Sequence, residues 1–187
     1  MSLRITGGTL RGRTIASPDG DSTRPTTDMW RQTIFSALDH LIDLQGAVVC
    51  DLYAGTGVLG IEALSRGAAA LTSVEKQPRR TKALSRTAVD LGIADQMTVV
   101  EADVVDWMGR AEAPFNLILA DPPYDLRVAN RLRDAVAAHG LLSPNGLLVI
   151  EHGPSEFLLD VDGWERVWGK EKGDTAVDIL QWQPLAS

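Results

Sequence analysis

Residues 118 to 124 read I-L-A-D-P-P-Y, an apolar run that ends in an aspartate, two prolines and a tyrosine. Proline has no backbone N–H group and a fixed φ, and it holds the residue before it extended, so this segment offers acceptors with few competing donors. The carboxylate of Asp121 and the carbonyl of Pro122 can each accept one hydrogen of a planar NH2 group. Tyr124 offers a flat face on which an aromatic base can stack. The predicted catalytic residues are Asp121, Pro122, Pro123 and Tyr124.

An amine conjugated to a base is a poor nucleophile, because its lone pair is delocalised into the ring. Binding both hydrogens favours a pyramidal nitrogen and directs the lone pair at an electrophilic methyl group for in-line displacement. An aspartate with an ordinary pKa of about 3.9 is too weak a base to deprotonate the amine beforehand. We therefore expect Asp121 to stabilise the charge that grows on nitrogen and to pass the proton to water.

A second candidate site is the glycine-rich segment D-L-Y-A-G-T-G-V-L-G, in which Gly55, Gly57 and Gly60 form the pattern G-x-G-x-x-G. Glycines at a strand-to-helix turn let a ligand approach the backbone and place it at the positive N-terminus of the helix. Glu75 ends the next apolar run, about twenty residues later, where an acid accepts hydrogen bonds from a ribose. On these features alone, NAD and S-adenosylmethionine are equally possible cofactors.

Two further acids favour S-adenosylmethionine. Asp51 precedes the glycine loop, where a carboxylate can bind the ammonium group of a cofactor but would repel a pyrophosphate. Asp103 follows the third apolar run and can accept a hydrogen bond from an adenine amine, cap a helix, or do both. A pocket rimmed with acids suits a cationic sulfonium cofactor. The predicted cofactor site consists of Asp51, Tyr53, Gly55, Gly57, Glu75, Asp103 and Val104.

Alternating strands and helices have to position these residues. We expect apolar strands at 46–52, 69–74, 97–100, 115–120 and 147–150. We expect helices after the glycine-rich turn to about residue 66, at 78–91, from 104 and at 126–138, and a turn at 143–146. Stretches 164–170 and 176–182 predict a C-terminal antiparallel hairpin. Repeated βα units predict an α/β fold with a mostly parallel, seven-stranded sheet and helices on both faces.

The first sixteen residues form a separate pattern. They alternate apolar and polar residues around Gly7-Gly8 and contain three arginines and no acid. This pattern predicts a small basic β-hairpin that turns at the glycine pair. The predicted organisation is a hairpin extension at 1–26 followed by a catalytic domain at 27–187, whose first helix begins at Thr27 or Asp28.

Composition limits the classes of protein that fit. With 187 residues and 44% hydrophobic content, the chain can bury a real core. A net charge of −7 argues against a general nucleic-acid coat protein, because phosphate binding requires Lys and Arg. Cys50 is the single cysteine, so we expect neither an intramolecular disulfide nor a bound metal.

Cellular location follows from the absence of an apolar leader or membrane segment. No run approaches the roughly 18 to 20 apolar residues that a bilayer span needs, so we expect a cytoplasmic protein without a membrane partner. The three histidines, His40, His139 and His152, are dispersed without a paired acid, and we expect surface or capping roles for them.

The motifs together resemble the bacterial 16S rRNA (guanine(966)-N(2))-methyltransferase family, within the class I S-adenosylmethionine-dependent methyltransferases. The resembling stretches are R-I-T-G-G-T-L-R-G-R, T-R-P-T-T-D, D-L-Y-A-G-T-G-V-L-G-I-E-A-L-S-R-G-A, L-A-D-P-P-Y and G-D-T. The resemblance implies a Rossmann-like class I methyltransferase fold and a hairpin that faces RNA. It also implies 16S ribosomal RNA, or a small-subunit particle, as the substrate of a monomeric enzyme. The predicted RNA-binding residues are Arg4, Arg11, Arg13 and Arg24.

Other functions are compatible with parts of this pattern. A DNA or protein amine methyltransferase can share the Asp-Pro-Pro-Tyr segment, although no stretch here is long enough for a separate DNA-recognition region. A non-catalytic RNA-binding assembly factor predicts the loss of an acid or a glycine from the loops, and none is missing. An NAD oxidoreductase fits only if the Asp-Pro-Pro-Tyr segment is incidental.

Overall fold

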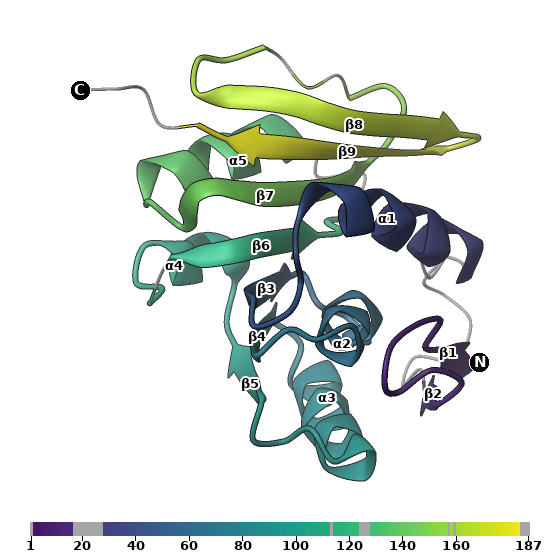
Figure 1. The fold of residues 1–187 in the computed structure, drawn as a ribbon. Helices are drawn as coiled ribbons and strands as arrows, with labels where there is room; N and C mark the ends of the chain where they lie inside the picture. The colour runs from purple at the N-terminus through teal and green to yellow at the C-terminus, as the bar shows by residue number, and fades with distance from the viewer. Residues whose placement is uncertain are drawn as a thin grey trace.

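The computed structural model of the chain describes residues 2–16, 28–112, 114–123, 128–156, 158 and 160–183 (Figure 1). The strands are β1 (Ser2–Arg4), β2 (Thr14–Ala16), β3 (Val48–Leu52), β4 (Ala70–Glu75), β5 (Met97–Glu101), β6 (Phe115–Ala120), β7 (Leu142–His152), β8 (Trp164–Lys172) and β9 (Thr175–Trp182). The helices are α1 (Asp28–Leu41), α2 (Val58–Ser65), α3 (Pro78–Leu91), α4 (Val104–Met108) and α5 (Ala129–Ala138).

A seven-stranded sheet organises the molecule, with the order β5-β4-β3-β6-β7-β9-β8. The first five of these strands pair in parallel, while β9 runs antiparallel to both β7 and β8. The chain leaves β3 toward β4 and β5 on one side and later returns to β6 on the other side. This reversal beside β3 is a topological switch point, where open α/β sheets bind their ligands. The predicted mixed sheet is confirmed.

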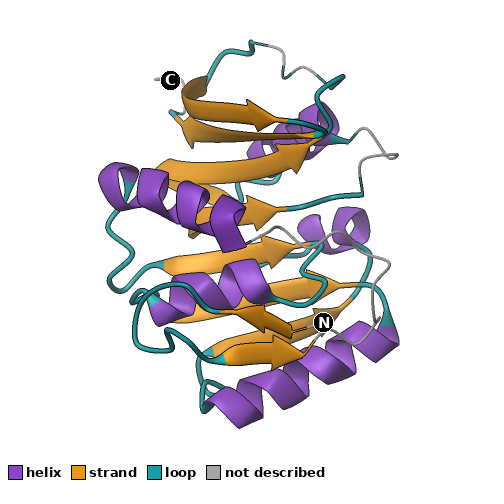
Figure 2. Cartoon of the chain, turned by 90° about the vertical axis from the view of Figure 1, so that its right-hand side faces the viewer, coloured by secondary structure: helices purple, strands orange, loops and turns teal. Residues whose placement is uncertain are grey.

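Helices cover both faces of the sheet (Figure 2). Val49 and Leu117 point to one core, which they share with residues of α1, α2 and α3. Their neighbours Cys50 and Ile118 point to the second core, under α4 and α5. Burial on both faces explains why these central strands read as continuous apolar runs rather than alternating ones.

One predicted turn lies inside a strand. Residues 143–146 belong to β7, which begins at Leu142 instead of after the turn. The pairing with β6 shifts register between Phe115↔Leu142 and Leu117↔Leu147, and Asn145 has a φ of 63°. The turn signal therefore produces a bulge within a continuing strand, because the residues on both sides of it still pair with β6.

The glycine pair in the N-terminal hairpin has a different role from the predicted one. β1 and β2 pair as expected, but Gly7 and Gly8 do not form a turn between these two strands. Residues 5–13 connect the strands instead, and this connection packs against α2. A Cβ on Gly8, whose φ is +72°, would lie 1.7 Å from the carbonyl oxygen of Ser65. The glycines are needed because the backbone approaches the C-terminal turn of α2 too closely for a side chain.

Candidate active site

The predicted acids come from adjacent parallel strands that end at the same edge of the sheet. Leu52 of β3 is level with Ala120 of β6, and Glu75 of β4 is level with Glu101 of β5. Asp51, Asp103 and Asp121 lie at or just after these strand ends. The register thus gathers residues that are up to 70 positions apart, from Asp51 to Asp121, along the edge beside the switch point.

The glycine loop turns sharply between β3 and α2. Tyr53, Gly55 and Gly57 all have positive φ values, of 60°, 55° and 74°. The Ala54 N–H donates to the Val74 carbonyl at 3.0 Å, so the loop continues to bond to β4 after β3 has ended. A Cβ on Gly57 would lie 2.4 Å from a methyl group of Leu84, so glycine is required both by conformation and by packing against α3.

Gly60 brings α2 against the buried carboxyl group of Asp51. Its N–H donates to Asp51 Oδ2 at 3.1 Å. A Cβ at position 60 would lie 2.7 Å from Leu71 Cδ1 and 3.0 Å from Asp51 Oδ2. The third glycine of the pattern therefore allows the helix to lie close enough to the sheet for this hydrogen bond.

Asp51 is 2% exposed, and its environment favours the neutral form. Burial raises its pKa to about 8, the Gly60 N–H opposes the shift, and the negative charge of Glu75 adds to it. A buried carboxyl group of this kind gains when a positive charge binds beside it. The site is therefore chemically suited to an ammonium or sulfonium ligand and unsuited to a pyrophosphate.

Glu75 holds the loop in place. Its Oε2 accepts from the Gly55 N–H at 3.0 Å and its Oε1 accepts from the Gln77 N–H at 2.8 Å. Arg80 Nη1 lies 3.9 Å from Oε2. An ionised carboxylate has about four acceptor positions, so these contacts leave capacity for ribose hydroxyl groups.

Asp103 is the N-cap of α4, as one of its two expected roles required. Its Oδ1 accepts from the Val105 N–H at 3.0 Å, and the residue is exposed at the rim. Burial and the charge of Asp103 raise the pKa of the half-buried Tyr53, while Arg131 opposes the shift, so Tyr53 lies in the field of Asp103. Val104 is 3% exposed in the core, so its side chain is covered and contact with a ligand would come from its backbone.

The predicted amine site follows β6 directly. Asp121 is half-buried, Pro122 is buried and Pro123 is exposed, and none of the three belongs to a helix or strand. Tyr124 lies outside the described residues. Asp121 thus stands one residue beyond the end of β6, beside the strand that carries Asp51.

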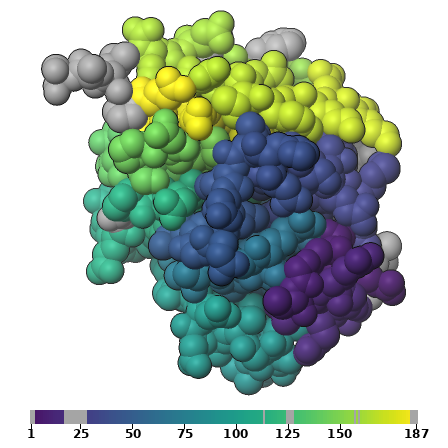
Figure 3. Space-filling view, viewed as in Figure 1, coloured from purple at the N-terminus to yellow at the C-terminus, as the bar shows by residue number. Residues whose placement is uncertain are grey.

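The N-terminal hairpin is attached to α2 by polar contacts with its last turns. The Thr6 N–H donates to Glu62 Oε2 at 2.8 Å and its hydroxyl donates to Oε1 at 2.7 Å. The Leu10 N–H donates to the Ser65 hydroxyl at 2.9 Å, and that hydroxyl donates to the Gly7 carbonyl at 2.5 Å. Residues 2–16, purple in Figure 3, accordingly lie against the main body of the protein.

Arg13, one of the predicted RNA-binding arginines, lies away from the active-site edge. Arg4, Arg11 and Arg13 are exposed, but Arg13 Nη2 donates to the Asp90 carbonyl at 2.9 Å, near the C-terminal end of α3. Because α3 starts beside the carboxyl end of β4 and runs back, this end lies at the opposite edge of the sheet. Arg24 lies outside the described residues.

The sequence does not indicate a polar cluster at the end of β7, where the buried His152 and Asp178 meet the exposed Arg166. His152, expected at the surface or in a cap, is 5% exposed and its Nε2 lies 3.1 Å from Asp178 Oδ2. Arg166 Nε donates to Asp178 Oδ1 at 2.7 Å. Antiparallel pairing of β7 with β9 brings His152 and Asp178 together although 26 residues separate them, and no local pattern signals such a contact.

The described residues contain no group of three or more His, Cys, Asp or Glu side chains arranged to hold a metal ion. None of their helices is both long enough and apolar enough to cross a membrane.

This arrangement of strands, switch point and glycine loop is the Rossmann-like class I methyltransferase fold. The solved structure of yhhF from Escherichia coli superimposes with a TM-score of 0.86 at 28% identity, covering 98% of this chain and 99% of that one. An RNA methyltransferase from Salinibacter ruber, solved with S-adenosyl-L-homocysteine, shares the fold with a TM-score of 0.66 at 18% identity, over 87% of this chain and 96% of that one.

The chain belongs to the family described as Conserved hypothetical protein 95, which matches residues 3–181. A relative from Escherichia coli strain K12, Ribosomal RNA small subunit methyltransferase D, is 33% identical over 180 residues. That match covers 96% of this chain and 89% of the relative.

Proposed function

We propose that this chain transfers the methyl group of S-adenosylmethionine to ribosomal RNA. The narrower proposal is that the acceptor is the exocyclic N(2) amine of a guanine in 16S ribosomal RNA, methylated in the cytoplasm on an assembling small-subunit particle. The observation that carries it is the placement of Asp121, Pro122 and Pro123 beside the acid-rimmed glycine loop, at adjacent strand ends. The name of the Escherichia coli relative, Ribosomal RNA small subunit methyltransferase D, supports the choice of ribosomal RNA.

The residues of the glycine loop fit a cationic cofactor. Asp51 would hold the ammonium group, Glu75 the ribose hydroxyl groups, and Asp103 the adenine amine, with Tyr53 beside it. The fit rests on Asp51, because burial raises the pKa of its carboxyl group to about 8 and a positive charge bound beside it would favour the carboxylate. When bound, S-adenosylmethionine supplies an electrophilic methyl group on a sulfonium. No metal takes part in this proposal.

The acceptor amine is positioned by the chain itself. The Asp121 carboxylate and the Pro122 carbonyl each accept one N–H of the guanine amine, which directs its lone pair along the line of displacement. As the N–C bond forms, the methyl–sulfur bond of the donor would break and S-adenosylhomocysteine would leave. Asp121 stabilises the positive charge that develops on nitrogen, and the proton then passes to water. Catalysis rests on positioning and electrostatic stabilisation, which matches the half-buried position of Asp121.

The hairpin extension at 1–26 and the Arg24 segment are proposed to contact the RNA backbone. The exposed Arg4 and Arg11 carry charges suited to phosphate, whereas Arg13 is already bonded to α3. Since Arg13 lies away from the active-site edge, it would contact RNA distant from the target base. Such an enzyme recognises a base splayed out of a loop within a larger folded substrate.

The test is methyl transfer from labelled S-adenosylmethionine to small-subunit particles from a strain lacking the endogenous methyltransferase. Asp121→Ala is expected to abolish transfer while calorimetry shows nearly unchanged affinity for S-adenosylhomocysteine. Asp125→Ala, four residues further along the chain, is a matched control that removes a neighbouring carboxylate. Transfer to DNA or to a protein substrate in place of the particle, or full turnover by Asp121→Ala, would overturn the proposal.

A further inference from the structure

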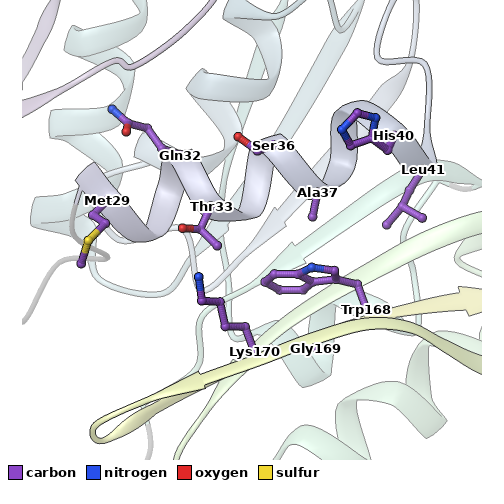
Figure 4. Close-up of a pocket in the computed structure, with 10 residues that line it drawn as sticks. All are labelled: Met29, Gln32, Thr33, Ser36, Ala37, His40, Leu41, Trp168, Gly169 and Lys170. Carbon is purple, nitrogen blue, oxygen red and sulfur yellow. The ribbon is translucent and has the colours of Figure 1, made fainter.

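A groove outside the predicted site lies between α1 and the edge strand β8 (Figure 4). Its volume is about 660 Å3, within the range of about 300–1,000 Å3 that is common for ligand clefts. One wall is formed by residues of α1 between Met29 and Leu41, and the floor by Trp168 and Lys170 of β8. The hairpin and the residues assigned to catalysis do not contribute to it among the described residues.

One end of the groove lies at the active-site edge of the sheet. Lys170 pairs with Val177, Val177 with Glu151, and Glu151 follows Ile150, which pairs with Ala120. Lys170 is therefore level with Asp121, three strands away across the sheet, a distance of about 14 Å at the usual strand spacing. At the same end, Lys172 Nζ lies 3.8 Å from Met29 Sδ in the first turn of α1.

The chemistry of the groove favours a nucleic-acid strand. Trp168 packs one side against the first core and is half-buried, so part of its indole lines the groove. In Figure 4 the ammonium group of Lys170 points toward α1, beside Thr33. The groove is lined by an indole, an ammonium group, an amide and two hydroxyl groups, and such groups can stack a base, bind its edge and neutralise a phosphate.

The charge of the groove differs from that of the rest of the protein. The chain has 25 acidic and 18 basic residues, a net charge of −7. Yet none of the described residues that line the groove is an aspartate or a glutamate, and Lys170 contributes a positive charge. An acidic protein that must hold RNA gains from keeping carboxylates out of the path of the strand.

We propose that the α1–β8 groove, lined by Gln32, Thr33, Ser36, Trp168 and Lys170, binds a single-stranded RNA nucleotide that flanks the target guanine by a few positions. This inference rests on the proposed function and adds a recognition subsite to it. Trp168 stacks the base, Lys170 contacts a phosphate, and the polar side chains of α1 bind the base edge or the ribose.

The test measures the binding of a 5′-labelled single-stranded oligoribonucleotide of about 12 nucleotides by fluorescence anisotropy. Trp168→Leu keeps an apolar contact with the core but removes the stacking ring, and it should raise the Kd about 5- to 100-fold. Trp168→Phe keeps a ring and should bind nearly as well as the wild type. With small-subunit particles as substrate, Trp168→Leu should raise KM and leave kcat unchanged.

A second variant does not touch the core. Lys170→Gln should make the salt dependence of oligonucleotide binding shallower by about one charge, whereas Lys82→Gln, which removes an exposed lysine of α3, should not. An unchanged Kd in Trp168→Leu, or a wild type that does not bind the oligonucleotide, would overturn the inference. So would weaker binding of particles with unchanged binding of the oligonucleotide, because the groove would then hold a ribosomal protein.

Separate results would show the failure of the groove inference and the failure of the proposed function. If the wild type methylates ribosomal RNA but Trp168→Leu binds the oligonucleotide as tightly as Trp168→Phe and the wild type do, the groove inference fails and the proposed function stands. If the wild type transfers no methyl group to ribosomal RNA, the proposed function fails whatever the oligonucleotide does.

Discussion

Asp51→Asn replaces a buried carboxyl group with a neutral amide of nearly the same shape. Burial, opposed by the Gly60 N–H and assisted by the charge of Glu75, raises the pKa of Asp51 from 3.8 to about 8. The folded protein therefore keeps a proton on Asp51 over a range of pH in which the unfolded chain loses it. One pKa unit corresponds to about 1.4 kcal/mol, so the free energy of unfolding falls by about that amount per pH unit in this range.

The sign of the effect follows from the direction of the shift. The stability associated with protonated Asp51 is fully present below about pH 4 and is lost as the pH rises to about 8. Asparagine does not titrate. The free energy of unfolding of Asp51→Asn minus that of the wild type should therefore increase by about 4 kcal/mol from about pH 5 to about pH 8 and then level off.

Urea unfolding followed by tryptophan fluorescence measures this difference, since the chain contains five tryptophans. Titrations of the cofactor-free protein at unit intervals from about pH 5 to about pH 9 define the slope. Asp95→Asn, which removes an exposed carboxylate, is the matched control for the loss of one charge. A difference between Asp51→Asn and the wild type that stays constant over the whole range would refute the burial argument and the cofactor role built on it.

Two further predictions concern the hairpin and the β7–β9 cluster. Gly8→Ala should lower the melting temperature more than Gly12→Ala. A Cβ at position 8 would lie 1.7 Å from the Ser65 carbonyl oxygen, while nothing lies within 4 Å of a Cβ at position 12. Equal shifts in differential scanning fluorimetry would contradict the role of Gly8 in packing the hairpin against α2. Burial lowers the pKa of His152, but its hydrogen bonds to Asp178 and to the next carbonyl outweigh this and raise it. His152 therefore contributes stability that is present below about pH 6.5 and is lost as the pH rises through its raised pKa. Urea unfolding should show that His152→Gln destabilises the protein more at about pH 6 than at about pH 9. The opposite trend would show that His152 is neutral in the folded protein.

Sequence reasoning located the candidate site because the rules that apply there are local. Apolar runs marked β3, β4 and β6, and the acids that follow them had to meet, since parallel strands share one carboxyl edge. The G-x-G-x-x-G pattern placed Gly55 and Gly57 in a turn that requires positive φ, and the structure has both there. The assignment of these residues to a cofactor stays a prediction.

The features that could not be predicted from the sequence depend on contacts between distant segments. Gly7 and Gly8 suggested a turn, but their conformation serves a contact with Ser65, more than fifty residues away. The pairing of His152 with Asp178 follows from strand register, which dispersed charged residues do not signal. The α1–β8 groove likewise exists only after α1 has packed beside the sheet edge, and a half-exposed Trp168 reads in the sequence as an ordinary strand residue.

We propose above all that the segment from Asp121 places a guanine N(2) amine in line with a methyl donor. Its most direct test is mass mapping of nucleosides in 16S ribosomal RNA after methyltransferase-deficient small-subunit particles have been incubated with the protein and S-adenosylmethionine. We predict N(2)-methylguanosine at a single position with the wild type and none with Asp121→Ala. A methyl group on another atom or base, or the same product with Asp121→Ala, would contradict it.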